Sequence, residues 1–168
     1  MPHDNYIQKI FLTLSLLSIF SFHVQDLAAQ DHDHHDHDHE IYNELATGGG
    51  IAFSTESPGI SPAFHVHAIK GLSPHIGIGL GYEVILGDEL HQSLAVLLNL
   101  KPVEILDINL GPALTLPSHD EPAGFGINAE IGLAFHVTRN LHLGPVFDTG
   151  WSLHGLHLIT GVHIGFDL

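Results

Sequence analysis

Residues 156–168, LHLITGVHIGFDL, carry the pattern that decides the fold. Every second residue of this stretch is apolar except for one threonine, whereas the residues between include His157, His163, Asp167 and two glycines. A period of two residues is typical of a β-strand that has one apolar and one polar face. The polar face is unusual because it carries glycine, histidine and acid, where a strand that faces water would carry Lys, Glu, Thr and Arg.

The same period of two recurs in eight segments between residues 41 and 168, and turn signals separate the segments. We predict strands at residues 44–55, 63–69, 75–86, 92–100, 105–116, 125–137, 141–153 and 156–168. Most of these approach the roughly 9–11 residues that a tilted strand needs to cross a bilayer. The connections are short enough for hairpins. The sequence therefore predicts an all-β fold, an eight-stranded antiparallel up-and-down β-barrel over residues 41–168.

The residue types on the two faces indicate which face is outside. A surface in contact with water is typically about a quarter to a third charged. Here Gly, Ala, Ser and Asn dominate the polar faces, and Lys or Arg occurs only near strand ends. Small residues fit the narrow lumen of an eight-stranded barrel, which bulky Leu, Ile and Phe would overcrowd. We therefore predict a transmembrane β-barrel whose apolar face contacts lipid.

The charged and aromatic residues agree with this assignment. If the first strand starts on the periplasmic side, the periplasmic rim carries Lys70, Lys101 and Arg139. The opposite rim then carries the acidic loop residues Glu56, Asp88, Glu89, Asp120 and Glu121. Aromatic residues gather near strand ends, with Phe53, Phe64, Phe125 and Trp151 at the acidic rim and Phe135 and Phe166 at the basic rim. Such aromatic girdles are typical of membrane barrels.

From residue 41 to 168 the chain resembles the small eight-stranded outer-membrane β-barrel proteins of Gram-negative bacteria. The resemblance implies a location in the outer membrane, contact with outer-membrane lipid and insertion by the outer-membrane assembly machinery, and we expect a monomer. Such proteins usually end on an aromatic residue, whereas this chain ends Phe166-Asp167-Leu168. Pro112 and Pro145 lie inside predicted strands, where each lacks an N–H for the ladder, so we expect local bulges there.

The N-terminus has the pattern of a secretory signal peptide over residues 1–29. Lys9 supplies a positive charge, residues 10–22 form an apolar run, and small residues precede a cleavage site after Ala29. The apolar run is shorter than the roughly 20 residues that a membrane-spanning helix needs. Residues 30–40 contain almost nothing to bury, so we expect a disordered tract rich in His and Asp.

The composition excludes several classes of function. The chain of 168 residues has no Cys, 19 acidic residues, 4 basic residues and a formal net charge of −15. Disulfides and thiolate metal sites are therefore absent. Binding to nucleic acid is disfavoured, because it depends on Lys and Arg that neutralise phosphates.

Residues 31–40, DHDHHDHDHE, offer the densest set of candidate metal ligands. The histidines are His32, His34, His35, His37 and His39, and the acids are Asp31, Asp33, Asp36, Asp38 and Glu40. Imidazole together with carboxylate suits Zn, Ni, Cu and Co better than Ca or Mg. We therefore predict that this periplasmic tract binds or buffers transition-metal ions. The alternative is a solvated acidic linker without a metal role.

The predicted lumen is a second place for chemistry. It would hold His65, His67, His136, His142, His157, His163, Glu83, Asp107, Glu130 and Asp148. Charges in a confined lumen must be paired, and histidine with carboxylate can form either a structural hydrogen-bond network, which we favour, or a metal site. In an outer loop, His119 with Asp120 and Glu121 is either a cation site or solvated.

Two further functions remain open as alternatives to metal binding. One is a structural or adhesion barrel. The other is a lipid A-modifying hydrolase that would use Ser152 and His154 with Asp148 or Glu130, because serine, histidine and acid are the groups of acyl-transfer sites. Ser152 and His154 should face the lumen, whereas lipid A deacylases work at the lipid-facing wall, so we predict that the protein is not an enzyme.

Overall fold

The computed structural model describes residues 41–55, 59–87, 90–118, 122–153 and 155–168. The strands in these ranges are β1 (Asn43–Ser54), β2 (Ile60–Ser73), β3 (Ile76–Leu86), β4 (Leu90–Val103), β5 (Leu106–Thr115), β6 (Gly124–Leu133), β7 (Phe135–Thr138), β8 (Leu141–Ser152) and β9 (Gly155–Asp167). The predicted signal peptide and the His/Asp tract lie outside the described residues. Within those residues, no helix is long and apolar enough to span a membrane.

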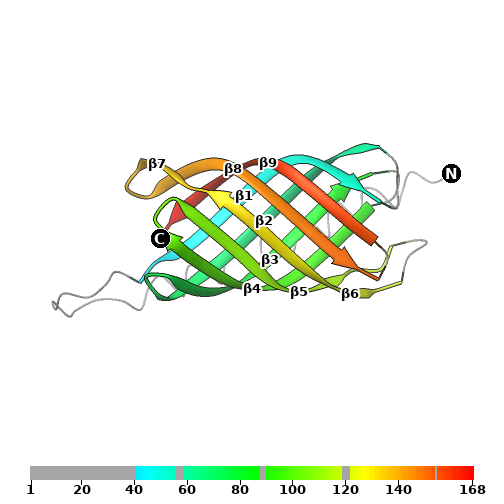
Figure 1. Ribbon diagram of the computed structural model, residues 1–168, viewed down its shortest axis with the longest axis horizontal. Helices are drawn as coiled ribbons and strands as arrows, with labels where there is room; N and C mark the ends of the chain where they lie inside the picture. Colours follow the sequence, from blue (N-terminus) through cyan, green and yellow to red (C-terminus); the bar gives the residue numbers. More distant parts are fainter. Residues whose placement is uncertain (1–40, 56–58, 88–89, 119–121, 154) are drawn as a thin grey trace. The chain divides into compact units, whose positions relative to one another are not determined.

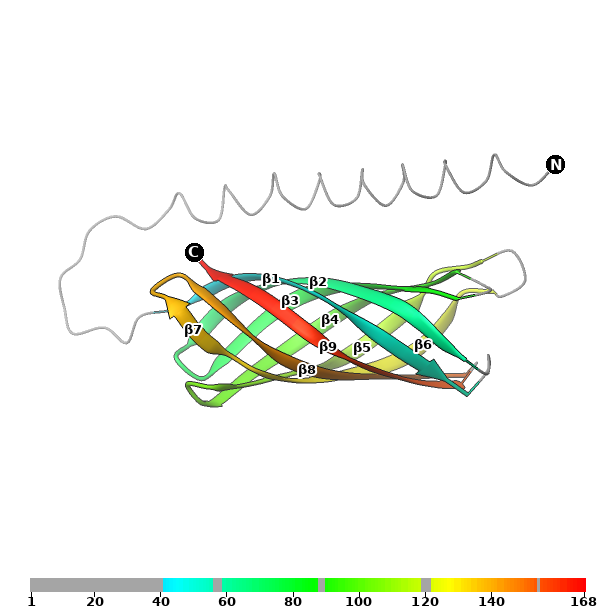
Figure 2. The same ribbon diagram turned by 90° about the horizontal axis from the view of Figure 1, so that it is seen from above.

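The strands form one closed antiparallel barrel (Figure 1). Strands that follow one another in the sequence pair with each other, except β6 and β7, which both pair with β8; β1 and β9 pair to close the barrel. β6 and β7 are two parts of one strand that is interrupted at Ala134, so the described chain makes an eight-stranded barrel. Figure 2 shows the strands tilted against the barrel axis, as closure requires. The predicted fold class is confirmed.

The apolar face lies outside and the polar face inside, as predicted. On β4, Val96 and Leu98 are 58% and 43% exposed, whereas Ala95 and Leu97, which alternate with them, are buried. Large apolar side chains are exposed on every strand from β1 to β9, and the buried positions are mostly small or polar. A continuous exposed apolar wall is unfavourable in water but stabilising in hydrocarbon. The barrel is therefore built to lie in a membrane.

We call the end of the barrel where β1 starts and β9 ends the near rim, and the opposite end the far rim. The near rim carries Lys70, Lys101 and Arg139, as the sequence predicts, although the side chain of Lys101 turns into the lumen. The acidic loop residues predicted for the far rim, Glu56, Asp88, Glu89, Asp120 and Glu121, lie outside the described residues. All six aromatic residues predicted for the rims are exposed.

The bulges expected at Pro112 and Pro145 are wrong. Pro112 keeps an unshifted register with Ile127 of β6, and Pro145 keeps one with Val162 of β9. Each proline follows a glycine that the neighbouring strand approaches closely: a Cβ on Gly111 or Gly144 would lie 1.7 or 1.6 Å from a carbonyl oxygen of that strand. On the other side of each proline the pairing lapses without a change of register, between Ala113 and Leu110 for the β4 ladder and between Val146 and Leu143 for the β6 and β7 ladders. The register shifts occur instead near the near rim, in β2, β4 and β7.

Candidate functional site

Polar and ionisable side chains line the lumen. The buried members are Glu44, His65, His67, Glu83, Ser93, Asn99, Asp107, Asn109, Thr115, Asn128, Glu130, His142, Asp148 and His163. His157 is mostly buried as well, with its side chain 12% exposed. The lumenal positions predicted for the histidines and acids are thus confirmed, except for His136, whose side chain is partly exposed at the near rim.

Glycine on the neighbouring strands makes room for the histidine rings. A Cβ on the opposing glycine would lie within about 2.5 Å of the ring in four cases, namely Gly48 with His65, Gly132 with His163, Gly150 with His157 and Gly165 with His142. Contacts under 3 Å are not found for real Cβ atoms, so the imidazoles occupy the space that glycine leaves. At these four positions, glycine and histidine therefore occur on neighbouring strands for a steric reason.

A network of ion pairs and hydrogen bonds fills the half of the lumen next to the near rim. Lys101 Nζ donates to Glu44 Oε2 at 2.6 Å and lies 3.5 Å from Asp107 Oδ2. The amide of Asn99 donates to Asp107 and to Asn109 Oδ1, and the hydroxyl of Tyr42 donates to Asn99. The structural network that the sequence predicts is present in this half.

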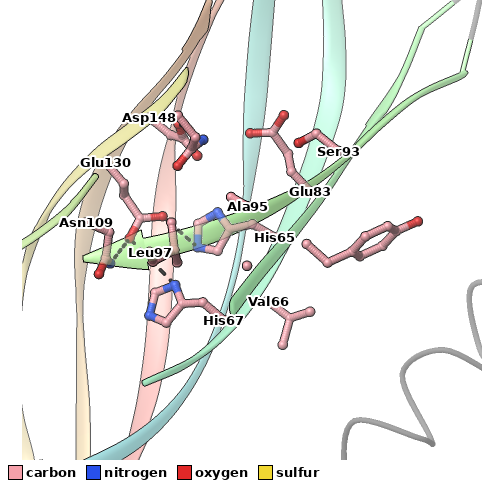
Figure 3. A pocket seen from close by; sticks show the side chains of 13 residues that line it. His65, Val66, His67, Glu83, Ser93, Ala95, Leu97, Asn109, Glu130 and Asp148 are labelled. Carbon is pink, nitrogen blue, oxygen red and sulfur yellow. Dashed lines mark hydrogen bonds and ion pairs between the residues drawn. The ribbon is translucent and has the colours of Figure 1, made fainter. Parts of the chain in front are cut away.

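A group of two histidines and one carboxylate lies in the middle of the barrel, where His65 and His67 of β2 face Glu130 of β6 (Figure 3). His65 Nε2 lies 3.6 Å from Glu130 Oε2, and His67 Nδ1 lies 3.7 Å from Glu130 Oε1. All three side chains are buried and line a cavity of about 20 Å³. Asn109 Nδ2 donates to Glu130 Oε1 at 2.9 Å and fixes the carboxylate.

A second group of the same composition lies towards the far rim. His157 Nε2 is 2.9 Å from Glu83 Oε1, and the rings of His157 and His91 meet edge to face with centroids 5.1 Å apart. The carboxyl group of Glu83 also interacts with that of Asp148, which accepts a hydrogen bond from Asn128. The sequence-based prediction missed His91 because the predicted strand starts at residue 92, two residues after the observed start of β4 at Leu90.

A third group lies at the near rim, where we call His136, His142 and Asp167 the rim group. Asp167 Oδ2 is 3.6 Å from His136 Nε2 and 3.6 Å from His142 Nδ1. His142 Nε2 is 3.8 Å from Glu44 Oε1, so the rim group is continuous with the lumenal network. Each of the three groups places its donor atoms within 4.8 Å of one another, as a bound metal ion would require.

The lumen has an excess of acidic groups. Among the described residues, five carboxyl groups are buried there, those of Glu44, Glu83, Asp107, Glu130 and Asp148, and Lys101 is the one basic residue that reaches them. Buried charges must be compensated. Protons on the histidines and carboxyl groups or a bound cation can supply the compensation. The lumen is therefore a cation-attracting environment lined with imidazole.

Several predicted site residues lie outside the described residues. They include the ten predicted ligands of the tract, which are Asp31, Asp33, Asp36, Asp38, Glu40 and the five histidines between them. They also include the loop residues His119, Asp120 and Glu121, and His154. Ser152, the partner proposed for His154, lines a small cavity together with His91 and His157. This position faces the lumen, as predicted, and does not favour a hydrolase that works on lipid at the outer wall.

Comparison with models of protein families finds no match, and neither does comparison with curated protein sequences. Solved structures do match. The attachment invasion locus protein Ail of Yersinia pestis is 10% identical with a TM-score of 0.56, over 77% of this chain and 99% of that chain. Neisserial surface protein A is also 10% identical with a TM-score of 0.56, over 76% and 97%.

The N-terminal β-barrel domain of OprF from Pseudomonas aeruginosa is 15% identical with a TM-score of 0.53, over 77% of this chain and all of that domain. At such identities the similarity concerns the fold. The fold is that of the small eight-stranded outer-membrane β-barrels, as the sequence predicts. Together with the exposed apolar wall, it supports the predicted location in the outer membrane.

Proposed function

We propose that this protein is an outer-membrane β-barrel that binds transition-metal ions, Zn, Ni, Cu or Co, and that the His/Asp tract of residues 31–40 captures most of them. The proposed role is binding or buffering, without an enzymatic reaction. Imidazole and carboxylate, the donors of the tract, are also the donors of the lumen, and both suit these metals better than Ca or Mg. A monomer inserted by the outer-membrane assembly machinery is part of the proposal.

The observation that carries the proposal is the rim group. His136, His142 and Asp167 place two imidazoles and one carboxylate together at the near rim. β1 starts at the same rim, where Leu168 N donates to the carbonyl oxygen of Asn43 at 2.8 Å. Glu40, the last residue of the tract, precedes Asn43 by only three residues. The tract is therefore covalently joined to the rim that already carries metal donors.

Isothermal titration calorimetry of the full chain in detergent, with Zn and with Ni, tests the proposal. The matched variant replaces the five tract histidines, His32, His34, His35, His37 and His39, by glutamine and keeps the acids. We expect the wild-type chain to bind several ions and the variant to lose most of that stoichiometry. Equal stoichiometry in the two proteins would refute the role of the tract.

A structural or adhesion barrel is the second candidate, and the name of one similar protein favours it. Ail is described as an attachment invasion locus protein, and one of its structures holds the heparin analogue sucrose octasulfate. This chain has 4 basic and 19 acidic residues, so a polyanionic ligand would be repelled. Adhesion without metal predicts that neither the wild-type chain nor the tract variant releases heat on addition of Zn or Ni.

A further inference from the structure

We propose that His65, His67 and Glu130 form a buried transition-metal site in the middle of the lumen, separate from the tract and from the rim group. The site goes beyond the proposed function because it needs no residue outside the described barrel. It would hold one divalent ion such as Zn or Co through two imidazole nitrogens and one carboxylate.

The distances between the three donor groups fit an ion better than they fit direct hydrogen bonds. The separations of 3.6 Å and 3.7 Å between imidazole nitrogens and Glu130 oxygens exceed the 2.7–3.2 Å of a normal hydrogen bond. Ligands about 2.0–2.2 Å from a tetrahedral ion lie roughly 3.3–3.6 Å from one another. His65 Nε2 is buried without a hydrogen-bond partner in the described structure. The two imidazole–carboxylate separations thus come close to those between ligands of one ion, and the donor atoms of all three residues lie within 4.8 Å of one another.

The cavity provides the space that such an ion needs. The three side chains share the lining of the central cavity of about 20 Å³ (Figure 3). A water molecule requires roughly 10–15 Å³ of this kind of volume. The cavity therefore has room for one ion.

The surrounding residues orient the ligands in the manner of known metal sites. His67 Nε2 lies 3.3 Å from Glu44 Oε1, which leaves Nδ1 as the free nitrogen that faces Glu130. A metal-bound histidine commonly donates its other N–H to a carboxylate. Glu44 is itself held by Lys101 at 2.6 Å, and Glu130 by Asn109 at 2.9 Å. His67 and Glu130 therefore each have an outer partner that fixes the orientation of the ligand: Glu44 for His67 and Asn109 for Glu130.

Charge and access also favour a cation at this position. The five buried carboxyl groups outnumber the single lysine, so a divalent ion reduces the excess negative charge. From the near rim, His142 lies 3.8 Å from Glu44, and Glu44 lies 3.3 Å from His67. A chain of donor atoms thus leads from the rim group to the central site.

The test uses the full chain with the five tract histidines replaced by glutamine. The groups of histidine and carboxylate that remain for metal binding are then those of the barrel. The protein is loaded with Co²⁺, dialysed, and measured by elemental analysis, visible absorption and X-ray absorption. We expect one tightly held ion per chain, a tetrahedral Co²⁺ spectrum, and a shell of two imidazoles and one carboxylate.

Two ligand variants and one control, all in this tract-variant chain, identify the residues. His65→Gln and Glu130→Gln should each weaken Co²⁺ binding by more than about 100-fold, since loss of an outer partner alone costs about 10–100-fold. His75→Gln, which changes an exposed histidine outside the three groups, should leave binding unchanged. Circular dichroism confirms that each variant keeps its β-structure.

The results separate the two proposals. A tract variant that binds no ion, or whose binding is insensitive to both His65→Gln and Glu130→Gln, would overturn the central site. A tract variant that binds as many ions as the wild-type chain would instead refute the capture role of the tract and leave the central site standing.

Discussion

Lys101→Met should destabilise the barrel strongly, because it removes the one described basic residue that turns into the lumen. Lys101 Nζ lies 2.6 Å from Glu44 Oε2 and 3.5 Å from Asp107 Oδ2, and it also lies 4.2 Å from the centre of the Tyr42 ring. Methionine has a similar length but no charge. The substitution would leave both carboxylates without their cation.

The expected loss in the free energy of unfolding follows from the burial of these groups. Removing one partner of a buried ion pair costs about 3–5 kcal/mol, because the other charge remains buried and uncompensated. The Lys101 side chain is 16% exposed, whereas that of Glu44 is 2% exposed. Partial exposure of the lysine places the expected loss near the lower limit, at about 3 kcal/mol.

Guanidinium unfolding in lipid vesicles, followed by the fluorescence of Trp151, measures this loss. Trp151 is the single tryptophan of the chain, so the signal has one source. Lys70→Met is the matched control, because Lys70 lies at the same rim but is exposed. A surface change of this kind should stay within about 0.5 kcal/mol.

Two further results would refute the reasoning about Lys101. The first is an equal effect of Lys101→Met and Lys70→Met. The second is a loss of unfolding free energy that does not change with pH. We expect the difference between wild type and Lys101→Met to shrink as the pH falls, because protonated Glu44 and Asp107 no longer need a cation. Adding Glu44→Gln to Lys101→Met should recover part of the lost stability.

The remaining predictions concern the lipid face, the packing of the histidines and metal binding. Leu98→Arg, in the middle of β4, should cost about 2–4 kcal/mol of unfolding free energy in vesicles, against about 0–1 kcal/mol for Leu153→Arg at the far rim; equal costs would contradict the membrane depth assigned to Leu98. Gly48→Ala should weaken Co²⁺ binding to the tract variant, because its Cβ would lie 2.4 Å from His65 Nε2, whereas Gly49→Ala on the outer face should not; titration of both variants measures this, and identical affinities would exclude the steric coupling. Zn binding to the wild-type chain should weaken as the pH drops below about 6.5, because only neutral imidazole is a ligand. Calorimetry at a series of pH values measures this affinity, and an affinity that stays constant would contradict the prediction.

The sequence predicts the barrel well because strand alternation is a local property. A strand with Val96 and Leu98 on one face and Ala95 and Leu97 on the other needs no distant partner to reveal its orientation. Strand ends depend on the neighbouring strand instead. β2 extends from Ile60 to Ser73, beyond the predicted residues 63–69, because pairing with β1 reaches Ile60 and pairing with β3 reaches Ser73.

The lumenal site could be predicted only in part. The histidines and acids of the polar faces are visible from the period of two, but which of them meet depends on the stagger of strands around the closed barrel. Glu44 contacts Lys101, 57 residues away in the chain, and this contact has no sequence signal. Glu44 itself could have been found, because it lies two residues before Ala46 on the inner face of β1.

The account depends on apolar side chains that face lipid and imidazoles that face the lumen. Quenching of tryptophan fluorescence by brominated lipids tests this most directly, with Trp151 in the wild-type chain and with Leu98→Trp in a Trp151→Phe background. We predict strong quenching of both, with position 98 most sensitive to bromine deep in the acyl chain and position 151 to bromine near the headgroup. An unquenched tryptophan at position 98 in a folded protein would contradict the orientation of the barrel wall.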